Sequence, residues 1–136
     1  MPKIQLRIYI DPGQAEVVLG IKDKQGFHER VTAIIDTGAA VSLFPNDLLD
    51  KVDFRPAERS AIIIDQAGIA GQSFAATEGF VTLFLEDQYG ARTQEFAARV
   101  WFADTGQALV GFDGILDRAI LHIDVRTRTG WMDIDP

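Results

Sequence analysis

The fold is decided by residues 31–45, which read VTAIIDTGAAVSLFP. A run of β-branched and apolar residues predicts a buried strand, which stops at a carboxylate, a hydroxyl and a glycine before a second apolar run begins. An ionised carboxylate between two apolar runs needs hydrogen bonds or a charged partner, because burying it alone is costly. Such groups are over-represented at functional sites, so Asp36 is the candidate functional residue.

Two further segments with recognisable patterns follow this stretch along the chain. Residues 34–39 read IIDTGA, residues 68–71 read GIAG, and residues 108–118 read ALVGFDGILDR. In this order they resemble the active-site loop, the flap tip and the final apolar-apolar-glycine strand with its helix in the retropepsin-like aspartic proteases, the small dimeric relatives of pepsin. The resemblance implies an all-β fold with one lobe per chain: a closed β-barrel with a flap hairpin and one or two short helices.

The resemblance also implies a chemistry. In that family one carboxylate activates a water, while a second, protonated carboxylic acid polarises the scissile carbonyl. Two such carboxyls share one proton. The chain supplies one convincing acid, Asp36, so the resemblance implies a homodimer with the site on its two-fold axis. Thr37 would bond the partner's loop, and Gly38 would leave room for the substrate.

Substrate contacts are implied for the rest of the loop and for the flap. The partner would be a polypeptide substrate, and no cofactor is expected. The residues expected to bind substrate are Ala39, Ala40, Gly68, Ile69, Ala70 and Gly71.

Asp-Thr-Gly occurs a second time, at residues 104–106, also after an apolar run. There Gly106 is followed by Gln107, where the family pattern has a small residue, and too little chain follows to build a second lobe. Asp, Thr and Gly all favour turns, with the Asp carboxylate bonding its own backbone and Gly taking positive φ. We therefore expect a turn at Asp104.

The loop departs from the retroviral pattern at two places. Retroviral members commonly carry an acid at the position of Ala40, paired with an arginine at the position of Phe112. The joint absence of both partners points to a cellular, bacterial-type branch. It also leaves open an alternative, in which the chain is a noncatalytic module of the same fold that binds peptides or self-associates.

Composition narrows the remaining possibilities. The chain of 136 residues fits one domain, 1–136, and its 13 basic and 20 acidic residues give a net charge of −7, which argues against a nucleic-acid partner. It has no cysteine, and no stretch approaches the ~20 apolar residues that span a bilayer. We expect no membrane partner and a cytoplasmic location. His28 has no neighbour at ligand spacing, so we expect a solvated or hydrogen-bonded strand histidine and no metal site.

Alternation and turn residues predict the remaining elements. Besides the strand that ends at Asp36, strands are expected at residues 3–10, 15–21, 61–64, 73–77 as the return arm of the flap, 80–85, 93–102, 109–111, 120–125 and 131–134. One short helix is expected within residues 45–52, capped by Asn46 or Asp47, and another at 114–119, capped by Asp113.

Overall fold

The regular secondary structure of the described residues is almost entirely β-strand, which confirms the predicted all-β class. The computed structural model describes residues 3–57, 62–64 and 74–135. Two single-turn 3-10 helices, η1 (Asn46–Leu48) and η2 (Leu116–Arg118), interrupt the strands. The strands are β1 (Ile4–Gln5), β2 (Arg7–Ile10), β3 (Gly13–Lys22), β4 (His28–Ile35), β5 (Leu43–Pro45), β6 (Arg55–Pro56), β7 (Ile62–Ile64), β8 (Phe74–Glu86), β9 (Phe96–Ala103), β10 (Ala108–Val110), β11 (Ala119–Asp124) and β12 (Thr129–Ile134).

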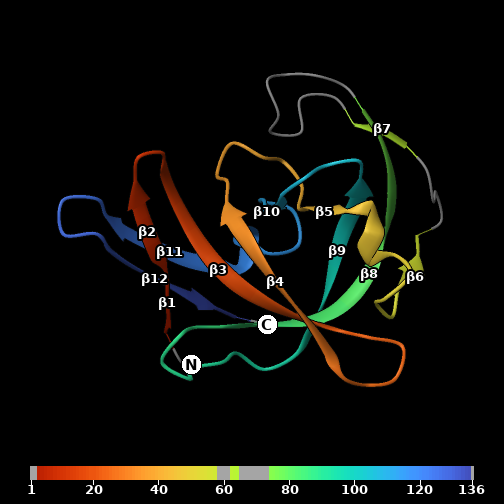
Figure 1. The fold of residues 1–136 in the computed structure, drawn as a ribbon, viewed down its shortest axis with the longest axis horizontal. Helices are drawn as coiled ribbons and strands as arrows, with labels where there is room; N and C mark the ends of the chain where they lie inside the picture. Colours follow the sequence, from red (N-terminus) through yellow and green to blue (C-terminus); the bar gives the residue numbers. More distant parts are fainter. Residues whose placement is uncertain (1–2, 58–61, 65–73, 136) are drawn as a thin grey trace.

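Six strands close into a barrel (Figure 1). Paired strands follow one another in the order β3, β4, β10, β5, β9, β8, and β8 pairs back onto β3. The β4–β10 and β5–β9 pairs are parallel, and the other pairs around the barrel are antiparallel. The predicted closed barrel is therefore confirmed. Closure gives each of these strands a neighbour on both sides and a shared apolar interior.

The β3–β4 hairpin leads to the candidate site. Alternate residues of β3 point into the barrel, as the period of a half-buried strand requires. The buried side chains are Ala15, Val17, Leu19 and Ile21. In β4, Ala33 and Ile35 are buried, and Asp36 follows directly after the strand, as predicted. The hairpin thus carries the carboxylate to the rim of the barrel.

A separate sheet holds both ends of the described chain. It has three strands in the order β1, β12, β11. Ile4 of β1 pairs with Met132 of β12, and the amide of Leu6 donates to the carbonyl of Gly130 at 2.9 Å. The first strand is therefore held by the last hairpin of its own chain.

Four predicted elements need correction. The single strand predicted at residues 3–10 is two strands, because the chain leaves the terminal sheet at Leu6 and joins the barrel sheet at β2. The separate strands predicted at 73–77 and 80–85 are one continuous strand, β8, which starts at Phe74. The strand predicted from residue 93 begins at Phe96, because the buried Thr93 turns its hydroxyl to accept a hydrogen bond from the Leu85 amide at 3.0 Å.

The predicted helix caps are wrong. Pro45 occupies the N-cap position of η1 and Ile115 that of η2, and neither helix has a side-chain cap hydrogen bond. Each helix is a single turn between two strands, so strand pairing fixes its ends and a cap contributes little. Asp113, expected as a cap, lies beside an arginine instead.

Candidate active site

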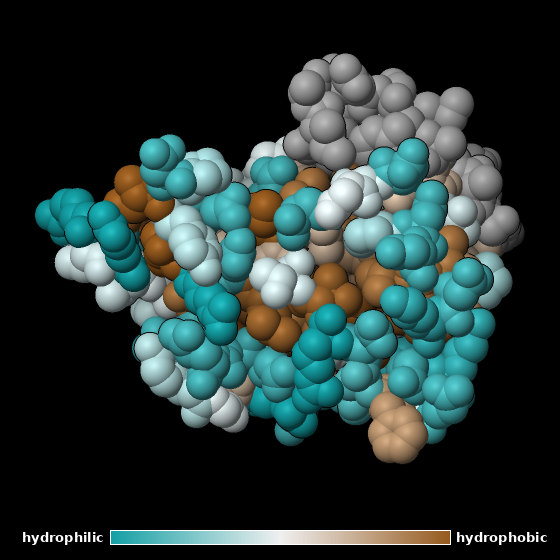
Figure 2. All heavy atoms as spheres, viewed as in Figure 1, coloured by the Kyte–Doolittle hydropathy of each residue, from teal (hydrophilic) through white to brown (hydrophobic). Residues whose placement is uncertain are grey.

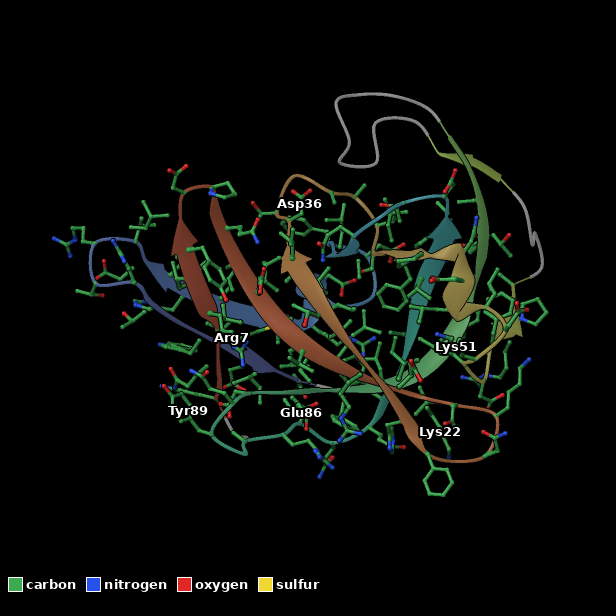
Figure 3. All side chains as sticks on the ribbon, in the orientation of Figure 1. Arg7, Lys22, Asp36, Lys51, Glu86 and Tyr89 are labelled. Atoms are coloured by element: carbon green, nitrogen blue, oxygen red, sulfur yellow. The ribbon has the colours of Figure 1, made fainter. Side chains whose placement is uncertain are left out.

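Asp36 lies at the end of β4, at the rim of the barrel (Figure 3). Its amide donates to the carbonyl of Val110 in β10 at 2.9 Å, which extends the parallel β4–β10 ladder past the end of the strand. The side chain is half-buried. Carboxylate Oδ1 accepts a hydrogen bond from the Gly38 amide at 2.9 Å, and the Asp36 carbonyl accepts one from the Ala39 amide at 3.1 Å. The loop therefore fixes the position of its own carboxylate.

The chain after β10 supports the other side of the loop. The amide of Phe112 donates to the Ala39 carbonyl at 3.0 Å, and the amide of Asp113 donates to the Ala40 carbonyl at 2.9 Å. A Cβ at Gly111 would lie 2.1 Å from the carbonyl oxygen of Val41, so only glycine fits there. This confirms the prediction that the apolar-apolar-glycine segment passes close beside the aspartate loop.

Ser42 is a supporting residue that the sequence analysis missed. It is completely buried, and its hydroxyl accepts a hydrogen bond from the Gly111 amide at 2.9 Å. Its carbonyl accepts a second one from the Trp101 amide at 3.0 Å. Ser42 thus joins the loop to β9 and to the segment after β10. The sequence feature that could have identified Ser42 is a hydroxyl residue within the apolar run that follows the loop.

Contacts between charged side chains connect β8, β9 and the segment after β10. Arg99 of β9 donates through Nε to Glu78 of β8, whose side chain is buried, and its Nη1 lies 3.7 Å from Oδ2 of Asp113. Arg99 also stacks over Trp101, with its guanidinium carbon 5.0 Å from the ring centroid. A buried carboxylate must be paired in this way. No local sequence pattern indicates that Glu78, Arg99 and Asp113 would meet.

The structure brings residues 36–40 together on one loop. Thr37, Gly38 and Ala40 are exposed beside Asp36, whereas the side chain of Ala39 is completely buried and faces away from solvent. A Cβ at residue 38 would lie 3.3 Å from Oδ1 of Asp36, so the small residue keeps space around the carboxylate. The described residues do not include the predicted flap residues, which are Gly68, Ile69, Ala70 and Gly71.

The second Asp-Thr-Gly forms a turn, as predicted, but by another mechanism. The hydroxyl of Thr105 donates to the Gln107 carbonyl at 3.1 Å and accepts from the Gln107 amide at 3.4 Å. Gly106 does not take positive φ, and Asp104 is exposed. The side chain of Gln107 donates to the carbonyl of Thr32 at 3.2 Å, so the turn lies beside the middle of β4 and not beside its end at Asp36.

His28 is a hydrogen-bonded strand histidine, as predicted. Its Nε2 lies 2.7 Å from Oε1 of Glu95, and its ring packs edge-on against Phe84 with centroids 4.8 Å apart. In the described ranges, no three acidic or histidine side chains gather as metal ligands would. No helix of the described chain has the length and apolar character needed to cross a bilayer.

Comparison with known proteins yields similarities among solved structures. No protein-family model matches the sequence, and the search of curated proteins finds no match. Among solved structures, the chain is similar to an EIAV protease in complex with the inhibitor HBY-793. The two are 14% identical, the match covers 72% of this chain and 81% of that one, and the TM-score is 0.45. The fold described above rests on the strand pairings and not on this similarity.

Proposed function

We propose that the chain is an aspartic endopeptidase of the retropepsin type, acting as a homodimer on polypeptide substrates. The observation that carries the proposal is the half-buried carboxylate of Asp36 at the barrel rim, held on a loop that the segment after β10 supports along its backbone. The order of the sequence motifs supports the same assignment. A fixed loop suits this chemistry, because the rate depends on holding the acid in one geometry.

Catalysis then requires a second copy of Asp36. Among the described residues, the Gly38 amide is the group that hydrogen-bonds to the carboxylate, and no second acid of the subunit does so. In the dimer, one Asp36 carboxylate takes a proton from water as the water oxygen bonds to the carbonyl carbon. The partner's protonated acid donates to the carbonyl oxygen. The tetrahedral diol collapses as the C–N bond breaks: the first Asp36 gives the proton it took from water to the leaving nitrogen, and the partner's carboxylate takes a proton back from a diol hydroxyl.

A noncatalytic peptide-binding or self-associating module is the second candidate function. The surroundings of the loop favour it, because Ala40 and Phe112 are both exposed where retroviral relatives carry an ion pair, and the side chain of Phe112 is 48% exposed. The same substitutions fit the proposed cellular, bacterial-type branch, in which another contact would stabilise the dimer. Peptide cleavage and pepstatin binding by the wild-type protein distinguish the two candidates, since only the enzyme shows both.

Replacing the candidate acid tests the proposal directly. Asp36→Asn removes the group that accepts the proton of the water, so we expect the rate of peptide cleavage to fall about a thousandfold or more. The matched control is Asp104→Asn, which changes the acid of the other Asp-Thr-Gly and should leave the rate unchanged. Cleavage would be measured on a peptide library by mass spectrometry. Wild-type activity in the Asp36 variant would contradict the proposal.

A further inference from the structure

Apolar side chains are exposed on one side of the molecule, where β2 and β11 lie next to each other. Tyr9, Ile123 and Val125 are 43%, 39% and 55% exposed, and with the half-buried Ile8 and the buried Ala15 they line a groove of about 180 Å³. A small group of hydrophobic residues is visible among hydrophilic ones at the left of Figure 2. We name these five residues the β2–β11 face. Contiguous apolar surface of this kind marks an interaction site more often than scattered apolar residues do.

This face begins two strands from the candidate catalytic acid. Glu16 pairs with Ile34 in the β3–β4 hairpin, and continuing this register by two residues puts Gln14 opposite Asp36. Gln14 in turn pairs with Tyr9 of β2. Strands lie about 4.8 Å apart, so the backbone at Tyr9 is roughly 10 Å from the backbone at Asp36. The ends of β2 and β4 point to the same side of the molecule in Figure 1.

The terminal sheet leaves one edge open beside this face. β1 pairs with β12 of its own chain, and β1 and β11 are the two edge strands of this sheet. β11 pairs with β12 on one side, and no strand within the described residues pairs with its other side. Ile120 of β11 is 63% exposed. An edge with exposed apolar residues needs a cover, since it would otherwise pair with other chains at random.

We infer that a second copy of this chain docks on the β2–β11 face and along the open edge of β11, without exchange of the terminal strands. The inference rests on the proposed function, which requires two Asp36 carboxylates at one axis. A two-fold interface uses the same surface on both copies. A copy that brings its Asp36 to that axis therefore covers the surface next to the acid, and the groove there is lined by uncharged residues. An uncharged contact surface avoids pressing acidic groups of two subunits, each of net charge −7, against each other.

Glutamate substitutions on the face test the inference. Tyr9→Glu and Val125→Glu each put a charge on exposed positions that tolerate one in the folded subunit. Each substitution appears twice in a two-fold dimer, so we expect the dissociation constant, measured by sedimentation equilibrium, to rise about 100-fold. The matched control is Phe27→Glu, at a side chain that is 72% exposed. Phe27 precedes the eight-residue β4, which puts it roughly 25 Å from Asp36 and from any axis there.

The absence of cysteine allows a second measurement that does not depend on disrupting the dimer. Val125→Cys and Phe27→Cys, each spin-labelled, report the distance between the two copies by pulsed electron resonance. We expect the shorter distance at residue 125. A shorter distance at residue 27, wild-type dimerisation of both glutamate variants, or a wild-type chain that is monomeric at high concentration would overturn the inference.

Two results separate this inference from the proposed function. If the wild-type chain dimerises through the face but cleaves no peptide, the docking surface is supported and the enzymatic proposal fails. If Asp36-dependent cleavage is found while Tyr9→Glu and Val125→Glu still dimerise and cleave normally, the enzymatic proposal is supported and the docking surface is wrong.

Discussion

Gly111 is the residue whose identity the site restricts most strictly. Its missing side chain lets two backbone segments touch, because a Cβ there would lie 2.1 Å from the Val41 carbonyl oxygen. Gly111→Ala should lower the free energy of unfolding by about 1–3 kcal/mol or more, since backbone atoms must move to admit the methyl group. Thermal or urea unfolding measures this. Gly106→Ala is the matched control: a Cβ there meets nothing within 4 Å, so its stability should change little.

The Ser42 hydroxyl gives a second prediction at the residue scale. Ser42→Ala removes the acceptor of the buried Gly111 amide and leaves that donor unpaired. We expect the free energy of unfolding to fall by about 1–3 kcal/mol. Thr105→Ala is the control, because its hydroxyl bonds the backbone of an exposed turn that water can reach. If the two variants lost equal stability in urea unfolding, the Ser42 hydroxyl would not be a special support of the loop.

The residues of the site differ in how far sequence could identify them. Asp36 and Gly111 could be predicted, because each interrupts an apolar run with a residue type that is unusual in a buried strand. The bond between Ser42 and Gly111 joins positions 69 residues apart, and Arg99 meets a glutamate 21 residues away. Such contacts depend on how the barrel closes, which no local pattern encodes.

At the scale of elements, the turn between β8 and β9 makes stability depend on pH. The hydrogen bond from Arg30 (2.8 Å) holds the pKa of Glu86 below its usual value, and a bond from Arg92 (2.9 Å) adds to this against the opposing effect of burial. Burial alone would raise the pKa of Asp87, but amides of the turn and of Gln5 in β1 outweigh it and lower the pKa. Asp87 thus attaches β1 to this turn.

Both carboxyls bind protons less tightly in the folded state than in the unfolded one. The stability they contribute is fully present above the unfolded-state pKa, about 4, and is lost as the pH falls through the lower folded pKa. Asp87→Asn should therefore be less stable than wild type at neutral pH, and the difference in melting temperature should disappear in acid. Gln88→Ala, in the same turn but without a titratable group, should differ from wild type by the same amount at every pH. A difference for Asp87→Asn that does not change with pH would contradict this account.

The strands themselves could largely be predicted from alternation, whereas their limits could not. β3 and β4 keep one face in the core, so the period of two was readable. The predicted helix caps were wrong because η1 and η2 are single turns whose ends the neighbouring strands determine. The β3–β8 pairing that closes the barrel joins strands far apart in the chain, and only the family resemblance indicated closure.

At the scale of the whole molecule, net charge and an apolar docking face act in opposite directions. In the proposed dimer, two subunits of net charge −7 repel each other, and burial of the β2–β11 face opposes this repulsion. Salt screens the repulsion and scarcely weakens apolar burial, so dimerisation should strengthen as sodium chloride rises from roughly 50 to 500 mM. Sedimentation equilibrium at several salt concentrations measures the dissociation constant. An interface held by ion pairs between the subunits would respond in the opposite direction, so weaker association at high salt would count against the β2–β11 face as the docking surface.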